Sequence, residues 1–313
     1  MFAFITRRLV SSLVTLVVVC CLTYILLFFS GGTVAQNILG ADATPEQIHA
    51  KEAQLGLDRP LLIRLGLWWT GALTGNFGKS WYNGEPVFEA ILNRLPITLT
   101  MVIAATVLTV FVSVVLAVAS SVRRGWIDRA IQVLGVIGTA LPNFLIGLFL
   151  VTFFAIQLGW FPAISTIYPG GGLSPWIASL TLPVIALTIG SVTAMTQQLR
   201  SAIIQQLELD YVRTLRSRGM RENVILYRHV LRNAAPPSLT LLGLHFVGML
   251  GGVVIIEQMF ALPGMGTLAV SATSTGDTPL VMGVVVYTIL LVIIVNLIVD
   301  LVNGWLNPKV RVS

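Results

Sequence analysis

The sequence predicts an all-α integral membrane protein with six transmembrane helices, and three observations support this fold class. Hydrophobic residues fill 56% of the 313 positions and charged residues only 10%, whereas an average soluble domain is about 45–50% apolar and about 25% charged. Six apolar runs reach the roughly 20 residues that a helix needs to cross a bilayer. Because these runs do not alternate polar with apolar residues, they predict helices and not barrel strands. An ordinary soluble enzyme and a disordered chain are excluded.

The predicted spans follow one another along the chain as Leu9–Phe29, Ile97–Val122, Ala130–Leu158, Ile177–Met195, Pro237–Ile256 and Leu280–Val302. Arg7 and Arg8 precede the first span, so a cleaved signal peptide is an alternative for it. However, its apolar run exceeds the about 7–15 residues of a signal core, and no small-residue cleavage site stands out. We therefore expect a retained helix.

The distribution of basic residues predicts the side of the membrane on which each loop lies. Fourteen of the nineteen Lys and Arg residues fall near the two termini and in the loops after the second and fourth spans. The two short loops on the other side, residues 159–176 and 257–279, contain none. Because short cytoplasmic loops carry the excess of Lys and Arg, we expect both termini to be cytoplasmic.

The organisation of the chain follows from these spans. We expect an N-terminal tail and first helix (1–29), an external segment (30–95), a five-helix core (96–303) with a cytoplasmic loop (197–236), and a cytoplasmic tail (304–313). The external segment begins irregularly. A helix then opens at Thr44, with Pro45 at its first position, and a second, amphipathic helix covers Leu61–Leu73.

Motifs of enzymes and cofactor sites are missing from the sequence. His49, His229 and His245 are expected outside, inside and within a span, so they cannot bind one metal ion together. Gly75–Ser80 imitates the end of a phosphate-binding loop, but Leu73 stands where that motif needs a glycine. We expect no catalytic residue, metal or cofactor in this chain. Basic cytoplasmic loops explain the net charge of +6, so this charge does not indicate nucleic-acid binding.

The spans are almost free of charged side chains. Glu257 and Asp300 lie near span ends, whereas carriers driven by protons or sodium ions bury ionisable residues near the middle of the bilayer. The driving force for any transport is therefore expected to come from outside this chain.

The cytoplasmic loop carries the clearest functional signal. Two short helices are expected on either side of Gly219, because glycine suits the left-handed turn that ends a helix. Apolar residues between arginines would make this helix pair a docking surface for another protein. By composition alone, a solvated loop that only follows the positive-inside pattern is an equal alternative.

The order of residues in this loop resembles the coupling loop of permeases of ABC importers, specifically the dipeptide/oligopeptide/nickel family. The stretch Asp210–Gly219 resembles the coupling helix and its closing glycine, and Arg228–Ala234 resembles the segment that enters span five. The residues expected to contact an ATPase are Asp210, Tyr211, Val212, Arg213, Thr214, Leu215, Arg216, Arg218, Gly219, Arg228 and His229.

The resemblance covers nearly the whole chain. Further segments that carry it are Leu55–Leu61, Gly75–Ser80, Arg94–Leu99, Leu141–Phe144, Gly159–Pro162 and Glu257–Gly266. The chain departs from the family at residues 31–33, after span one, and at Gly276. The resemblance implies the type I permease fold of ABC importers.

The same resemblance implies partners and a location. They are a second homologous permease, two ATPase domains that bind ATP and Mg, an extracellular substrate-binding protein, and lipid of a bacterial or archaeal cell membrane. Peptides are the expected cargo; nickel, haem or another nutrient is the alternative, and an ATP-independent carrier or channel is the rival class. The residues expected to brace the outer loops or dock the binding protein are Glu257, Phe260, Pro263, Gly264, Gly266 and Asp277.

Three polar or kinking residues are candidates for a pore or gate. Pro142 should kink its span, as a packing feature or as a gate hinge, because proline leaves a carbonyl group unpaired. His245 and Gln258 would add polar groups near span five. A polar contact between helices is the alternative role for His245.

Overall fold

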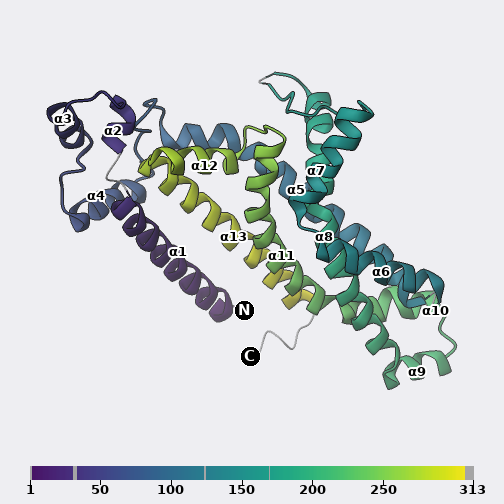
Figure 1. The fold of residues 1–313 in the computed structure, drawn as a ribbon. Coiled ribbons are helices and arrows are strands. Elements are labelled where there is room, and N and C mark those ends of the chain that lie inside the picture. The colour runs from purple at the N-terminus through teal and green to yellow at the C-terminus, as the bar shows by residue number, and fades with distance from the viewer. Residues whose placement is uncertain (1, 31–33, 123–124, 169, 307–313) are drawn as a thin grey trace. The chain divides into compact units, whose positions relative to one another are not determined.

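The structure is a computed structural model that describes residues 2–30, 34–122, 125–168 and 170–306 (Figure 1). These residues are mostly helical, and their only strand-like pairing is an isolated bridge between Lys79 and Pro86. The elements are α1 Phe2–Ser30, α2 Val34–Leu39, α3 Pro45–Leu55, α4 Leu61–Leu73, α5 Val87–Val122, α6 Trp126–Ala140, α7 Asn143–Leu150, the π-helical η1 Val151–Gln157, α8 Leu173–Leu207, α9 Asp210–Ser217, α10 Glu222–Val224, the π-helical η2 Ile225–Val230, α11 Leu231–Met259, α12 Met265–Thr275 and α13 Thr278–Leu306.

Five helices of the described chain are long and apolar enough to cross a membrane, or six if one bent pair counts as a single span. This confirms the predicted all-α membrane fold class. The helices of the later spans extend several residues beyond the predicted bounds, since α8 alone covers Leu173–Leu207. The cytoplasmic location of the termini stays a prediction.

The third predicted span, Ala130–Leu158, is not continuous. Its two halves, α6 and α7 with η1, meet at an angle of 100°. Leu141 has an extended backbone (φ −87°, ψ 122°), because the residue before a proline avoids the helical region, and Pro142 has no N–H to continue the hydrogen-bond ladder. The expected kink at Pro142 is therefore a full break between two helices.

The chain divides into two compact units. The first unit contains Leu99–Leu262 and the chain from Ile294 onward, and the second contains Phe2–Thr98 and Pro263–Ile293. The boundary between the units falls inside α5 and inside α13, so each of these helices has one end in the first unit and one end in the second. The functional segments expected from the sequence, with bounds at residues 30, 96 and 304, stay predictions.

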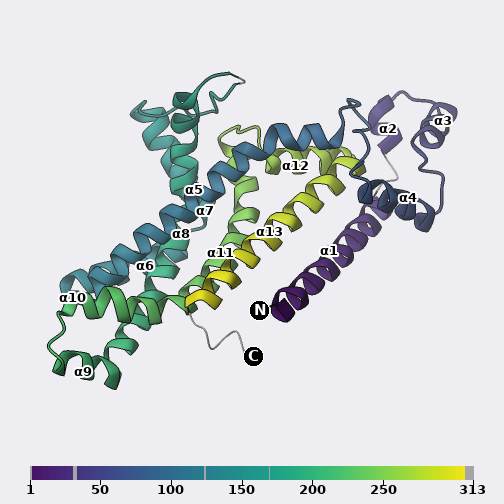
Figure 2. The ribbon, with the colours of Figure 1, turned by 180° about the vertical axis from the view of Figure 1, so that it is seen from behind.

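Helix α8 is the centre of the first unit, where it packs against α6, α7 and α11 (Figures 1 and 2). Two glycines of α6 allow the close approach to α8. A Cβ atom on Gly138 would lie 2.6 Å from the Thr193 hydroxyl oxygen, and one on Gly135 would lie 2.9 Å from the Gln197 amide nitrogen. Small residues at helix contacts let backbones approach in membrane proteins, so these two positions set the α6–α8 spacing.

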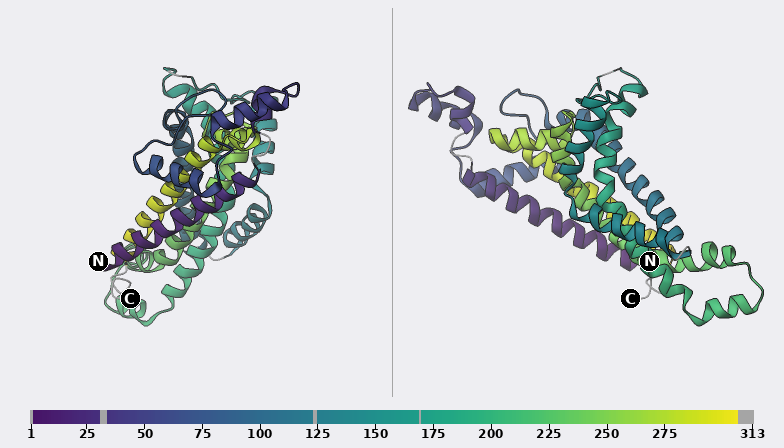
Figure 3. Two further views of the ribbon diagram at one scale, coloured as in Figure 1. Left: turned by 90° about the vertical axis from the view of Figure 1, so that its left-hand side faces the viewer. Right: turned by 45° about the vertical axis from the view of Figure 1, so that its right-hand side comes forward.

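The second unit is held by apolar packing around the starts of α5 and α13. Its main buried cluster comprises Val87, Ala90, Ile91, Met265, Leu268, Ala272, Leu280, Val281 and Val284. A second cluster joins Cys20 and Tyr24 of α1 to Met282 and Val286 of α13, with Trp68 of α4 packed against it. The ribbons of α1 and α4 lie next to each other in this unit (Figure 3).

The local helix signals of the external segment match the structure. Helix α3 begins after Thr44, whose hydroxyl accepts from the Gln47 N–H while the Gln47 side chain accepts from the Thr44 N–H. Helix α4 has the expected bounds, Leu61–Leu73. The expected irregular start is wrong at Val34–Leu39, which forms α2. Helix α12 was also not expected, because residues 257–279 were interpreted as a loop.

The packing of α13 against α5 gives a stability prediction. A Cβ atom on Gly283 would lie only 2.3 Å from Cγ1 of Val87, a stiff branched side chain, whereas one on Gly304 of the same helix would meet nothing within 4 Å. We expect Gly283→Ala to lower the free energy of unfolding by about 1–3 kcal/mol through overpacking, visible as a lower melting temperature in detergent.

Gly304→Ala is the matched control, and it should leave that temperature unchanged or raise it, because alanine is the better helix former. Equal melting temperatures for the two variants would contradict the prediction.

Candidate functional site

Helix α9 lies at the end of the first unit opposite to α7 (Figures 1 and 2). It is short and two-sided. Val212 on one side is fully buried, whereas the side chains of Asp210 and Arg213 on the other side are 93% and 75% exposed. The residues expected to contact an ATPase are therefore divided between an inner and an outer face.

The inner face of α9 packs into an apolar cluster that we call the loop core. Its buried residues are Ala117, Leu199, Ala202, Ile203, Val212, Ile225, Leu226, Val230 and Ala234. They come from the end of α5, the end of α8, α9, η2 and the start of α11. Since three of these helices are candidate spans, the loop core joins α9 directly to membrane-spanning helices.

The remaining predicted contact residues lie around this core. Tyr211, Leu215 and His229 are half-buried. The exposed ones are Asp210, Arg213, Thr214, Arg216, Arg218, Gly219 and Arg228. The four exposed arginines of this set would suit an acidic groove of another protein, and contact with an ATPase stays a prediction.

A tight turn at Gly219 ends α9. Gly219 has φ +76°, its N–H donates to the Arg216 carbonyl at 2.9 Å, and the Met220 N–H donates to the Leu215 carbonyl at 3.2 Å. These two bonds define the Schellman motif of helix ends. The sequence-based expectation of a left-handed glycine at this helix end is confirmed.

An ion pair closes the turn between α9 and α10. Nε of Arg216 lies 2.7 Å from Oε1 of Glu222, and Nη2 lies 3.2 Å from Oε2. Both side chains are about half exposed, so the pair contributes at most about 1 kcal/mol to stability. Its contribution is to fix the direction in which the chain leaves α9.

A second ion pair, which the sequence analysis did not find, lies between α6 and α8. Nε and Nη2 of Arg200 each lie 2.7 Å from a carboxylate oxygen of Asp128. The Ser120 hydroxyl at the end of α5 donates to the same carboxylate and accepts from Arg200 at 2.9 Å. Asp128 is the only acidic residue between spans two and three, which was a signal for a paired role.

The residues expected to brace outer loops or dock a binding protein are mostly buried. Glu257 and Phe260 belong to the first unit, where they are 0% and 2% exposed. In the second unit Gly264, Gly266 and Asp277 are buried and Pro263 is exposed. Docking at these positions stays a prediction.

Asp277 braces the second unit from within. Its carboxylate accepts from the Ser80 hydroxyl at 2.6 Å and from the Leu280 N–H at 3.5 Å. Burial raises the pKa of this carboxyl above its usual range, although these bonds oppose the shift. The contact holds the Gly75–Ser80 motif to the start of α13, which explains a motif that only imitates a phosphate loop.

Two of the three pore candidates line one cavity. Pro142 and His245 are both part of an open cavity of about 390 Å³ in the first unit. Gln258 is not among its lining residues and is exposed near the end of α11. The structure therefore brings Pro142 and His245 together but leaves Gln258 apart.

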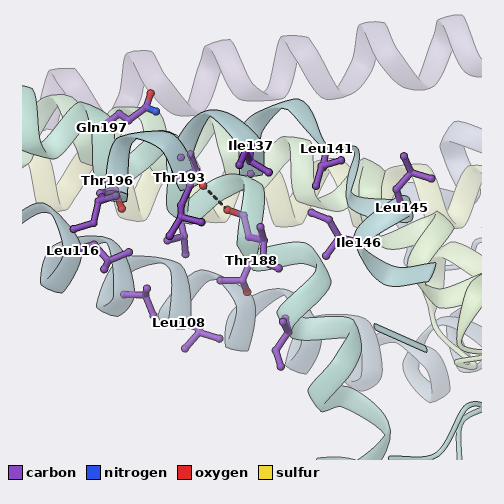
Figure 4. A pocket seen from close by; sticks show the side chains of 18 of the residues that line it. Leu108, Leu116, Ile137, Leu141, Leu145, Ile146, Thr188, Thr193, Thr196 and Gln197 are labelled. Atoms are coloured by element: carbon purple, nitrogen blue, oxygen red, sulfur yellow. Dashed lines mark hydrogen bonds between the residues drawn. The ribbon is translucent and has the colours of Figure 1, made fainter. Parts of the chain in front are cut away.

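A larger cavity of about 690 Å³ lies between α5, α6, α7 and α8 (Figure 4). Most of its lining side chains are aliphatic, such as Leu108, Leu116 and Ile137. The Thr193 hydroxyl donates to the Ile189 carbonyl of its own helix at 3.1 Å. This surface suits lipid tails or the apolar face of another chain.

Within the described residues, no group of three or more His, Cys, Asp and Glu side chains could hold a metal ion.

Sequence comparison finds relatives along the whole chain. Residues 111–312 match the family described as binding-protein-dependent transport system inner membrane component, and residues 1–102 match the N-terminal family of the same membrane components. A protein of Brucella abortus named as a peptide transport system permease is 33% identical over 99% of both chains. A glutathione transport system permease protein of Salmonella choleraesuis is 32% identical, again over 99% of both chains.

Solved structures share the fold. The inward-facing methionine ABC transporter MetNI matches 69% of this chain and 95% of its own with a TM-score of 0.54 and 15% identity. An amino acid ABC transporter matches 68% of this chain and 92% of its own with a TM-score of 0.52 and 18% identity. At these identities the similarity shows the fold alone.

The turn at Gly219 gives a prediction on the order of α9. A Cβ atom there would meet nothing within 4 Å, so Gly219→Ala tests the backbone conformation without a clash. A left-handed alanine costs about 1–2 kcal/mol, and we expect amide hydrogen exchange of α9 to accelerate about tenfold.

Gly219→Asn is the control, because asparagine tolerates the left-handed region. It should exchange more slowly than the alanine variant. Identical exchange in both variants would show that this turn does not hold α9.

Proposed function

Because the chain belongs to the family of binding-protein-dependent transport system inner membrane components, we propose that it forms half of a peptide-import pore that is driven by ATP hydrolysis in partner subunits. The chain is a multi-pass membrane protein. The relatives come from Brucella and Salmonella, which supports a location in the bacterial inner membrane.

The observation that carries this proposal is the attachment of α9 to the loop core. The charged outer face of α9 is exposed, and its inner face is buried among the ends of α5, α8 and α11. A displacement of α9 would therefore be transmitted to these membrane-spanning helices. Packed elements move between discrete arrangements as rigid bodies. When the ATPases close on ATP, they would displace α9 and with it the helix ends that it contacts.

The proposed assembly contains four further parts. A second homologous permease completes the pore, two ATPase domains bind ATP and Mg beneath the loops, and an outer binding protein delivers cargo. The chain itself contributes coupling and passage without its own ATPase site. No residue of this chain is proposed to bind the nucleotide or its metal.

Peptides are the proposed cargo, because relatives that are about one third identical over their full length carry peptide and glutathione transport in their names. The binding protein that works with this permease should bind di- or tripeptides in titration calorimetry, with nickel and haem as the competing ligands. Binding of nickel or haem with no heat from peptides would replace the cargo and keep the mechanism.

The outer face of α9 gives a test of coupling. Reversing one exposed charge by Arg213→Glu should weaken association with the ATPases by about tenfold, since charges at a contact rim change association strongly. The expected result is a loss of ATPase co-purification and of ATP-driven uptake, with normal insertion of the permease.

Arg129→Glu is the matched control, because Arg129 is also exposed and lies outside the loop of α9. This variant should keep both activities. Equal losses in the two variants would indicate a general effect of net charge and would contradict the assignment of α9 as the contact.

A further inference from the structure

The helix break at Pro142 opens a cavity that differs in chemistry from the spans around it. The cavity of about 390 Å³ is lined by the end of α6, the start of α7, and faces of α8 and α11. Its polar side chains include Asn143, Ser191 and His245. Most of the side chains that line the neighbouring cavity of the first unit are aliphatic.

Three polar side chains of this cavity are not used by the protein itself, whereas the hydroxyl of Thr139, which also lines it, donates to the Gly135 carbonyl at 3.2 Å. Ser191 is only 6% exposed, yet neither its hydroxyl nor the side chains of Asn143 and His245 make a hydrogen bond within the described chain. By contrast, Thr188 and Thr193 on the same helix satisfy their hydroxyls on carbonyls of the preceding turn. The unused groups of the cavity are therefore not explained by helix geometry.

Unpaired polar groups at membrane depth are costly, at several kcal/mol each, unless they face water or a bound molecule. The start of α7 adds to this set, because the leading N–H groups of a helix have no partner within it. Here the Leu145 and Ile146 N–H groups donate to the Pro142 carbonyl, which leaves the N–H groups of Asn143 and Phe144. The cavity thus offers N–H donors from Asn143 and the start of α7, together with acceptors from Ser191 and Asn143.

Donors and acceptors without charge are complementary to the C=O and N–H groups of a peptide backbone. No Lys, Arg, Asp or Glu lines the cavity, so it does not select a charged side chain. Asn143 is held in place by close packing, since a Cβ atom on Gly190 would lie 3.2 Å from its Oδ1 and one on Gly252 would lie 3.6 Å from its Nδ2.

We propose that this cavity at the α6–α7 break is a station of the translocation path that binds the main-chain amides of the passing peptide through Asn143, Ser191 and the start of α7. This inference rests on the proposed function. It assigns the contact with cargo to uncharged groups and leaves recognition of peptide side chains to other parts of the transporter.

Gly248 allows the cavity to be filled without disturbing the fold. It lines the cavity, and a Cβ atom there would meet nothing within 4 Å. Gly251, on the same helix, also has open space around it but does not line the cavity. Both residues are exposed within α11, so the two leucine variants are a matched pair.

The assembled transporter with its binding protein is reconstituted in vesicles, and uptake of trialanine is measured. Gly248→Leu should reduce uptake by about tenfold or more, because passage depends on pore width and on the polar groups that line it. Gly251→Leu should change it by less than about threefold. Equal uptake by the two variants would overturn the proposal.

A second measurement does not depend on the cargo. Cys20 and Cys21, the native cysteines, are replaced by alanine, and Ser191→Cys is exposed to a membrane-impermeant methanethiosulfonate in the assembled complex with and without ATP. The thiol should react in at least one nucleotide state, and trialanine should slow the reaction. Ser238→Cys is the control, because Ser238 is also buried, at 1% exposed against 6% for Ser191, and also unpartnered, but lies outside the cavity.

The outcomes separate the inference from the function. If the Ser191→Cys thiol stays unreactive in every nucleotide state, or reacts no faster than the control, the cavity is not part of the translocation path. If the thiol reacts but trialanine does not protect it, in a transporter that takes up trialanine, the cavity does not bind the main-chain amides of the peptide. A reactive thiol in a transporter that takes up no peptide supports the path and refutes peptide as the cargo.

Discussion

The constraint on which the structure depends is that each backbone N–H and C=O group within a bilayer needs a partner inside the protein. Long helices such as α5, α8 and α11 meet it within one segment for most of their length. They continue across Pro96, Pro183, Pro236 and Pro237, each of which removes one bond of the ladder without ending the helix. The pair Leu141–Pro142 is different, because the chain turns by 100° there and helix ends face a cavity. The place where the ladder fails is also where polar side chains gather.

In the proposed mechanism α8 connects the loop core with the polar cavity, because it contributes residues to both. Near its C-terminal end α8 contributes Leu199 and Ile203 to the loop core, and near its middle it contributes Gly190 and Ser191 to the polar cavity. Next to the loop-core residue Leu199, Arg200 binds Asp128 of α6 through two short bonds. A displacement of α9 that moves α8 would therefore also move α6, and with it one wall of the cavity.

Sequence reasoning succeeded where structure is set by neighbours in the chain. The cap at Thr44 and the left-handed Gly219 depend on a few consecutive residues, and the spans depend on composition alone. It failed where distant residues decide. Helix α12 is fixed in part by the Met265 N–H that donates to the Thr98 hydroxyl at 2.8 Å, a contact across 167 positions of sequence. The Asp128–Arg200 pair and the joint placement of Pro142 and His245 depend on tertiary packing in the same way.

The positions of the few charged residues in this chain bear on how ATP-driven transport would work. A charge at the centre of a span costs about 2.5–3.5 kcal/mol on insertion scales, so each one needs a partner or an end position. Arg200 and Asp128 satisfy each other, and the exposed arginines of the loop lie outside the spans. No Lys, Arg, Asp or Glu lines the polar cavity, so the cavity offers no charged group of the kind that couples ion flow to transport. In the proposed mechanism energy enters as motion at α9, and a cavity without charged residues would let peptides of different side-chain charge pass without holding any of them tightly.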